Sequence, residues 1–395
     1  MRRRDHIFIS DVDWRDDRNL SVHHLVRILR ERERVFYVDS VGGFRRLGLQ
    51  DLSRVGRKIR QMLSDHGGPA PTDSRGPIIV QPMSIPDPWV TVRWPSLNAR
   101  LLRSAIHRVV GRHRIERPVV WTRVASEAVW QAISTLERSA LVYYVTGEER
   151  LSPWLGRTVR AHIERWDLLF TEHADLVCLS AAGLTDRRAA ARGTVRFFPN
   201  GVDLDTLRPT TERAAPITKV QGPIAGFVGT IDRRIDVQLI ESVASRLRGW
   251  TVLLVGPIAD GDIGKRLAAI PNAKLVGSVP FGDLPTYVSH FHCGLVPYVV
   301  NDFARGIFPC KVAEYLALGV PVVSTPLPEL LRLGQLVTIV SNPAEAVIAI
   351  ERWRVRADRA TRESLRESSR PLSWRPMVET MRELVEQSAE ASDAR

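Results

Sequence analysis

The sequence predicts an α/β protein of two doubly wound domains, each a parallel sheet covered by helices on both faces. Its length of 395 residues is typical of about two domains. In both halves, short apolar runs alternate with amphipathic helical segments, the pattern of parallel strands joined by helices. A polar, proline-rich stretch, 204–223, lies between the halves as a domain boundary would. We therefore predict a first domain over 1–205 and a second over 206–372.

The first half opens with a strand, an amphipathic helix over 19–31 and a second strand, which predicts a parallel pair with a right-handed crossover. Further strands and two long helices follow. The predicted strands are 6–10, 34–40, 118–122, 140–145 and 174–180, and the later helices are 97–114 and 157–173. The first strand is not followed by G-x-G-x-x-G, which disfavours a dinucleotide-binding enzyme.

After the boundary the strand pattern restarts. The predicted strands are 224–230, 251–256, 273–278, 293–298 and 320–325. A charged helical part, 342–371, follows them. An amphipathic helix over 374–387 then presents Trp374, Val378, Met381 and Val385 on one face.

The stretch 301–325 carries the clearest local signals. Pro309 suits the start of a helix because it lacks the N–H that would be orphaned there. We predict about three helical turns after it. Gly319 ends them because it can adopt the left-handed cap conformation, and Pro321 forbids continuation. The apolar run that follows is typical of a buried parallel strand.

Two charged residues interrupt this apolar helix, Lys311 in its first turn and Glu314 three residues later. That spacing places both on one face. A cation is unfavourable at the positive end of a helix, unless an anion is bound there by Lys311 and the free N–H groups together. The alternative is an ordinary ion pair on a solvated face.

The motif P-x-K-x-x-E-Y-x-A-x-G-x-P-V-V-S over 309–324 resembles the donor-site signature of GT-B glycosyltransferases, in particular the large retaining family that uses nucleoside-diphosphate sugars. The runs F-V-G-T-I-D-R-R-I-D at 227–236 and P-N-G-V-D at 199–203 resemble the same family. N-D-F-x-x-G-I at 301–307 is similar to a bacterial cell-surface subgroup. The resemblance implies a GT-B fold, with two Rossmann-like domains facing across a cleft and the helix 373–395 crossing back to the first.

The resemblance also implies a donor site in the second domain. Lys311 would contact the donor diphosphate, with Arg234, or Arg233 in its place, as the second cation, and Glu314 would bind the ribose hydroxyls. Gly229 and Thr230 would let the backbone approach the phosphates, and Val279 would lie near the nucleobase. The remaining donor-site candidates are Asn301, Phe303, Gly306, Ile307, Phe308 and Pro309.

Gly306 departs from the resembled family, whose members commonly carry a glutamate at this position, in the loop that faces the donor sugar. The departure leaves the sugar and the retaining or inverting outcome open. It also leaves open a catalytically inactive partner protein.

Acidic residues follow two predicted strands of the first domain, at the sheet edge where ligands bind in open α/β folds. Asp11, Asp13 and Trp14 follow the first strand, and Glu148 and Glu149 follow the run 140–145. Any of them is a candidate for the acceptor side, and Asp13 or Asp11 for a general base. The alternatives are a capped, solvated turn for the first group and the start of a helix for the second.

The net charge of +12 calls for an anionic partner: nucleic acid, an anionic membrane or a phosphorylated substrate. The segments 54–63 and 97–114 are basic and helical. A basic amphipathic helix either lies on a membrane or packs into a core with an arginine-rich outer face. The arginines are dispersed and no nucleic-acid motif is present, so we expect no nucleic-acid partner.

We expect no metal and no cofactor, since the nucleotide sugar is a co-substrate. Cys178, Cys293 and Cys310 lack metal-like or C-x-x-C spacing. No apolar run reaches the length of a membrane span, and the N-terminal apolar segment is too short for a signal peptide. We expect a cytoplasmic protein, at the inner face of the membrane if the basic helices bind lipid.

The sequence thus predicts transfer of a sugar from a nucleoside-diphosphate sugar to a glycan, a lipid-linked or a natural-product acceptor, with retention implied by the resemblance. A nucleotide-sugar epimerase of the same fold and a basic nucleic-acid-binding protein are the alternatives.

Overall fold

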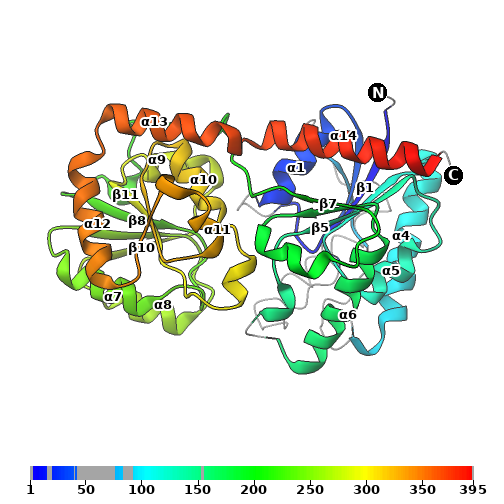
Figure 1. Cartoon of the computed structure of the whole chain (residues 1–395), viewed down its shortest axis with the longest axis horizontal. Coiled ribbons are helices and arrows are strands. Elements are labelled where there is room, and N and C mark those ends of the chain that lie inside the picture. Colours follow the sequence, from blue (N-terminus) through cyan, green and yellow to red (C-terminus); the bar gives the residue numbers. More distant parts are fainter. Residues whose placement is uncertain are drawn as a thin grey trace.

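The computed structural model describes residues 3–15, 20–39, 41, 76–82, 92–152 and 155–393. Within them the chain forms two parallel sheets, which lie side by side in Figure 1. The first sheet has the strand order β3-β2-β1-β4-β5-β6-β7, and the second has the order β10-β9-β8-β11-β12-β13. Both orders are doubly wound, as predicted: in each domain the chain adds strands on one side of its first strand and then crosses to add the others on the opposite side.

The elements of the first domain are β1 (Asp5–Ile9), α1 (Ser21–Arg30), β2 (Arg34–Val38), β3 (Ile78–Val80), α4 (Pro95–His113), β4 (Val119–Thr122), α5 (Glu127–Ile133), β5 (Ala140–Val145), η2 (Glu149–Leu151), α6 (Arg157–His173), β6 (Leu176–Leu179), η3 (Ala182–Arg188) and β7 (Thr194–Phe197).

The elements that follow are η4 (Ala215–Ile217), β8 (Ile224–Val228), α7 (Val237–Arg246), β9 (Thr251–Val255), α8 (Gly261–Ala268), β10 (Ala273–Gly277), η5 (Phe281–Asp283), α9 (Leu284–Val288), β11 (Cys293–Val296), η6 (Phe303–Gly306), α10 (Cys310–Ala317), β12 (Val322–Ser324), α11 (Pro328–Leu331), η7 (Gly334–Leu336), β13 (Val337–Ile339), α12 (Pro343–Arg356), α13 (Arg359–Ser369), η8 (Arg370–Leu372) and α14 (Trp374–Asp393).

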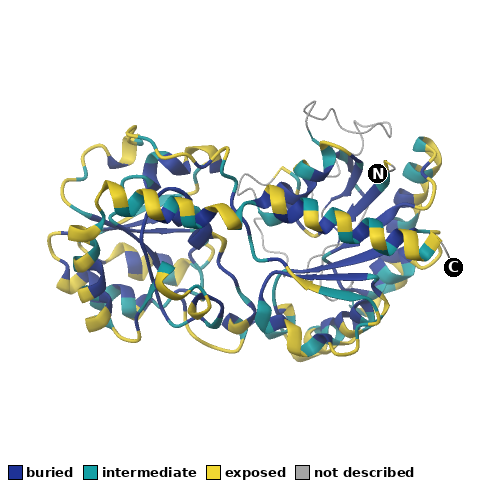
Figure 2. Cartoon of the chain, turned by 45° about the horizontal axis from the view of Figure 1, so that its top comes forward, coloured by how far each residue is buried: buried dark blue, intermediate teal, exposed yellow. Residues whose placement is uncertain are grey.

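The predicted strands are all present, and the opening β1-α1-β2 unit pairs in parallel as expected. The inner strands are buried on both faces, the edge strands β7 and β10 are partly exposed, and exposed residues gather on the outer sides of the helices (Figure 2). Burial on both faces explains why the strand sequences are continuous apolar runs rather than alternating ones.

The terminal helix α14 returns to the first domain (Figure 1), as the resemblance implied. Its apolar face, which includes Trp374, Val378, Met381 and Val385, is buried in one cluster with first-domain residues such as Phe8 and Leu25. The first domain is therefore completed by the end of the chain.

The basic helix α4 packs against α5 and buries Leu102, Ala105 and Ile106 in the first-domain core. Its outer face carries exposed arginines, including Arg100 and Arg108. The prediction of a core helix with an arginine-rich outer face is confirmed for this segment, whereas 54–63 lies outside the described residues. No helix in the described ranges is long and apolar enough to cross a membrane.

Candidate active site

The helix α10 begins one residue after Pro309, which is its N-cap residue, and has eight residues, so it is shorter than the three turns predicted. Gly319 ends it with φ +70°, and the N–H groups of Gly319 and Val320 donate to Leu316 O and Tyr315 O. The predicted glycine cap is therefore confirmed.

Lys311, in the first turn of α10, has only 5% of its surface exposed. Its Nζ donates a hydrogen bond of 2.6 Å to Tyr298 Oη, and lies 4.7 Å from the Tyr298 ring centroid and 5.2 Å from that of Phe227. The structure shows no ion pair between Lys311 and Glu314. The alternative of an ordinary ion pair on a solvated face is therefore wrong.

Arg234 approaches the same tyrosine from the loop after β8. Its guanidinium carbon lies 5.8 Å from the Tyr298 ring centroid, and Asp232 holds the group in place with an Nη2–Oδ2 distance of 2.7 Å. Arg233 instead points outward, with 71% of its side chain exposed, and pairs with Asp260. Of the two arginines, only Arg234 therefore lies with Lys311.

Gly229 leaves room for Lys311. It has φ +139°, and a Cβ added to it would lie 3.3 Å from Lys311 Nζ and 3.1 Å from Cε. Its N–H donates to Val255 O, so it is not available to a phosphate. Gly229 therefore contributes by having no side chain. Thr230, the next residue, is half-buried.

Glu314 lies one turn beyond Lys311 and is half-buried. Desolvation raises the pKa of its carboxyl group, and Lys311 and Cys310 partly offset the effect. The Cys310 side chain reaches solvent, yet the surrounding protein and Glu314 raise the pKa of its thiol to about 12. Cys310 is thus a poor nucleophile at neutral pH.

The loop before α10 contacts the first domain. Phe308 packs with Leu184 in the first-domain core, and its carbonyl accepts a hydrogen bond of 2.8 Å from Asn200 Nδ2. A Cβ added to Gly306 would lie 2.9 Å from Leu184 Cδ2 and 3.2 Å from Glu148 N. The Phe308 side chain is thus buried in the first domain, and its donor contact stays a prediction. A side chain at position 306 would require Leu184 and Glu148 to shift.

The other loop candidates have local roles. Asn301 Oδ1 accepts the N–H of Ala304 and so caps η6. Pro309 is buried at the N-cap, whereas Phe303, Ile307 and, beyond β10, Val279 are half-buried. Val279 packs against the second-domain core. Among the described residues, Asn301 forms no hydrogen bond with Lys311 or Arg234, and the donor contacts of these loop residues stay predictions.

On the first-domain side, Asp11 pairs with Arg123 at an Nε–Oδ1 distance of 2.9 Å. Desolvation raises the pKa of Glu149, as does Asp11, whereas Arg123 and Arg234 lower it. Because Arg234 belongs to the second domain, these groups from both domains lie close enough to influence one carboxyl group. The neighbouring Glu148 is buried and pairs with Arg150.

Asp13 and Trp14 are held within the first domain. Asp13 Oδ1 accepts the N–H of Arg15 in a local turn, as in the alternative of a solvated turn. Trp14 packs against His23 and Tyr37, with ring centroids 5.1 Å away in each case. Neither residue is brought to Lys311 and Arg234.

Tyr298 and Arg123 were not identified from the sequence. Both follow buried strands, β11 and β4, at the carboxyl edge where ligands bind, and that position is the signal that could have found them. Nowhere in the described ranges do His, Cys, Asp and Glu side chains form a group able to hold a metal.

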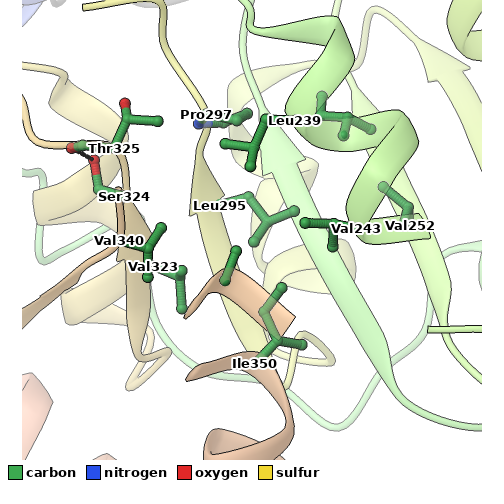
Figure 3. A pocket seen from close by; sticks show the side chains of 12 residues that line it. Leu239, Val243, Val252, Leu295, Pro297, Val323, Ser324, Thr325, Val340 and Ile350 are labelled. Carbon is green, nitrogen blue, oxygen red and sulfur yellow. Dashed lines mark hydrogen bonds between the residues drawn. The ribbon is translucent and has the colours of Figure 1, made fainter. Parts of the chain in front are cut away.

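A separate apolar cavity lies between α7, α12 and the second sheet (Figure 3). It is lined by Leu239, Val243, Leu295, Val323 and Ile350, among others. Lacking charged groups, this cavity is unsuited to a phosphate.

Comparison with protein-family models indicates the class of this protein. Residues 222–353 match the family model described as "Glycosyl transferases group 1", so the second half of the chain contains a domain of this type. Together with the two parallel-sheet domains, this match confirms a GT-B glycosyltransferase fold.

The sequence is also similar to that of one curated glycosyltransferase. The chain is 30% identical, over 194 residues, to the putative teichuronic acid biosynthesis glycosyltransferase TuaH of Bacillus subtilis (strain 168). The match covers 47% of this chain and 48% of that protein, so the chain spans about half the length of the curated relative it matches.

Solved structures share the whole fold at low identity. Sucrose-phosphate synthase from Thermosynechococcus elongatus superposes with a TM-score of 0.75 at 17% identity, over 98% of this chain and 100% of that chain. Anabaena HepE in complex with UDP and glucose has a TM-score of 0.65 at 14% identity, over 97% of this chain and 99% of that chain.

Proposed function

We propose that this protein is a glycosyltransferase that moves a sugar from a nucleoside-diphosphate sugar to an acceptor hydroxyl. The observation that carries the proposal is the convergence of Lys311 and Arg234 on Tyr298 at the start of α10. As the anomeric bond breaks, negative charge grows on the departing diphosphate. Two fixed cations and the positive end of α10 would stabilise that charge more in the transition state than in the ground state.

We assign donor binding to the domain over 206–372 and acceptor binding to the domain over 1–205. UDP is our first candidate for the nucleotide, because HepE binds UDP in its complex and shares the fold. Glu314, one turn from Lys311, is suited to accept hydrogen bonds from the ribose hydroxyls. A comparison of UDP, ADP and GDP binding by calorimetry would identify the base.

For the acceptor, Glu149 is a first-domain group that interacts with Arg234, and Asp11 and Arg123 interact with Glu149 in turn. Carboxylates at this position are suited to orient a hydroxyl group, so we propose a glycan or lipid-linked sugar as the acceptor. Retention of the anomeric configuration is proposed from the family resemblance alone. NMR analysis of the product would establish the stereochemistry, and an epimerised nucleotide sugar formed without any acceptor would favour the epimerase instead.

The decisive experiment is Lys311→Ala, with release of UDP from UDP-sugars as the readout. We expect a loss of about 10²–10³ in turnover, by analogy with the removal of one donor from an oxyanion hole. Lys265→Ala is the matched control, because Lys265 is exposed and pairs only weakly, at 3.9 Å, with Asp262. Unchanged turnover in folded Lys311→Ala protein would contradict the proposal.

We also propose a peripheral contact between α4 and an anionic membrane. Residues 92–115 contain six arginines and no acidic residue. Arg93, Arg100, Arg108 and Arg114 are exposed and pair with no acid among the described residues. At the start of the helix, Trp94 is 62% exposed and Leu97 is 44% exposed. Exposed cations beside exposed apolar groups are typical of surfaces that bind anionic lipid.

Sedimentation with vesicles would test this contact. Wild-type protein should bind phosphatidylglycerol vesicles and not phosphatidylcholine vesicles, and the double substitution Arg100→Glu with Arg108→Glu should abolish binding. Arg352→Glu with Arg356→Glu is the matched control, because both of these exposed arginines lie on α12 of the second domain. Equal binding by all three proteins would exclude α4 as the contact.

A further inference from the structure

Tyr298 is fixed in place by its surroundings. It lies two residues after β11 and is 4% exposed. Its backbone forms an antiparallel bridge with Ile235, and its carbonyl accepts a 2.7 Å hydrogen bond from Thr325 Oγ1. The ring also packs edge-to-face against Phe227, with centroids 6.3 Å apart. The position of the hydroxyl group is therefore set before any ligand arrives.

The hydroxyl of Tyr298 has an unused proton. Its oxygen accepts the 2.6 Å hydrogen bond from Lys311 Nζ, and an ammonium group can only donate, so the phenolic proton points elsewhere. No acceptor for that proton is present among the described residues. A hydroxyl that accepts a hydrogen bond from a cation is polarised and becomes a better donor.

The same ring also determines where the two cations stand. Lys311 Nζ lies 4.7 Å from its centroid and Arg234 Cζ lies 5.8 Å from it. The lysine side chain is long and flexible, so its hydrogen bond to a rigid phenol restricts the ammonium group to one place. The two positive charges are thus held beside one ring, and because Asp232 balances only one of them, the site favours an anionic ligand.

We propose that Tyr298 is a binding residue for the diphosphate, which donates its O–H to a phosphate oxygen and holds Lys311 in position. This inference rests on the proposed function and adds a third side-chain donor to its two cations. It also gives a reason for a tyrosine at this position, where a phenylalanine would pack equally well against Phe227.

The test is Tyr298→Phe, which removes the hydroxyl and keeps the ring. Calorimetric titrations would use UDP, inorganic pyrophosphate and, as a ligand without phosphates, uridine. A hydrogen bond to a charged group predicts affinities for UDP and pyrophosphate that fall about tenfold or more, with uridine affinity unchanged. Tyr287→Phe is the matched control, because Tyr287 is a buried tyrosine of α9 with no contact to Lys311 or Arg234 among the described residues.

A double-mutant cycle with Lys311→Met tests whether Tyr298 acts by holding Lys311 in position or by an effect independent of Lys311. If Tyr298 acts partly through Lys311, the loss in the double variant should be clearly smaller than the product of the single losses. Binding of UDP by Tyr298→Phe within twofold of wild type would overturn the inference and leave the proposed function intact. Failure of the wild-type protein to bind UDP, ADP, GDP or pyrophosphate would overturn both.

Discussion

The surroundings of Lys311 stabilise its charge, whereas those of Glu314 destabilise the charge of its carboxylate. Lys311 has a hydrogen-bond partner and two aromatic faces, whereas desolvation penalises the ionised carboxyl group of Glu314 and raises its pKa. A charge that is kept at a cost in stability is typical of a binding residue.

The substitution Glu314→Gln should therefore stabilise the protein and weaken nucleotide binding. The unfolded chain ionises at the ordinary value of 4.5 while the folded protein keeps the proton, so the cost in stability is absent below 4.5 and complete above the raised pKa. The gain in free energy of unfolding should thus grow as the pH rises from 4.5 through the raised pKa. Urea denaturation at about pH 4 and about pH 8 would measure it. Exposed Glu390→Gln is the control, and a larger gain at the lower pH would contradict this account.

Residue patterns predicted the second domain's site better than the first domain's. Lys311, Arg234 and Gly229 do lie together, because each is held by a short segment whose sequence specifies its own turn or cap. The roles of Asp13 and Trp14 stay predictions, because an acid or an aromatic in a loop has the same sequence signature whether it faces a ligand or packs locally. Tyr298 needed the three-dimensional arrangement.

At the scale of elements, the cap of α10 depends on Gly319. It has φ +70°, and an added Cβ would lie 2.8 Å from Arg362 O. We expect Gly319→Ala to destabilise the protein by about 1–3 kcal/mol, from backbone strain and the contact with α13. Urea denaturation would measure the loss. Gly249→Ala, with open space around its Cβ, should change stability far less, and equal effects would argue against a cap mechanism.

Three edge strands are absent from the predicted set: β3 and β13, with three residues each, and β7, with four. Edge strands this short provide no periodicity to detect, and their conformation is set by the neighbouring strand to which they bond. The inner strands were found because their burial on both faces requires continuous apolar sequence.

At the scale of the whole molecule, one junction between the domains passes through Gly183. Its N–H donates to Glu329 Oε1 at 2.7 Å, and an added Cβ would clash with the carbonyl oxygen of Arg305. We expect Gly183→Ala to loosen this junction while both domains stay folded. Limited proteolysis within the polar stretch 204–223 should then be faster than in wild type. Gly156→Ala, which meets nothing nearby, should leave the rate unchanged.

The return of α14 to the first domain should make the end of the chain important for stability. Met381 is fully buried there. We expect Met381→Ala to cost about 2–5 kcal/mol, as do other large-to-small substitutions in cores. Thermal unfolding would detect the loss, with exposed Glu383→Ala as the control. A loss equal to that of the control would show that α14 is not part of the first domain's cooperative unit.

The burial of Phe308 in the first domain ties the start of α10 to both halves of the protein. If the two halves separate, the Phe308 ring must leave the first-domain core, and the first turn of α10 with Lys311 must move with it. Under the proposed function, nucleotide binding at this turn is therefore coupled to separation of the two halves. Because such coupling is reciprocal, if separation of the halves weakens nucleotide binding, nucleotide binding must oppose separation by the same free energy.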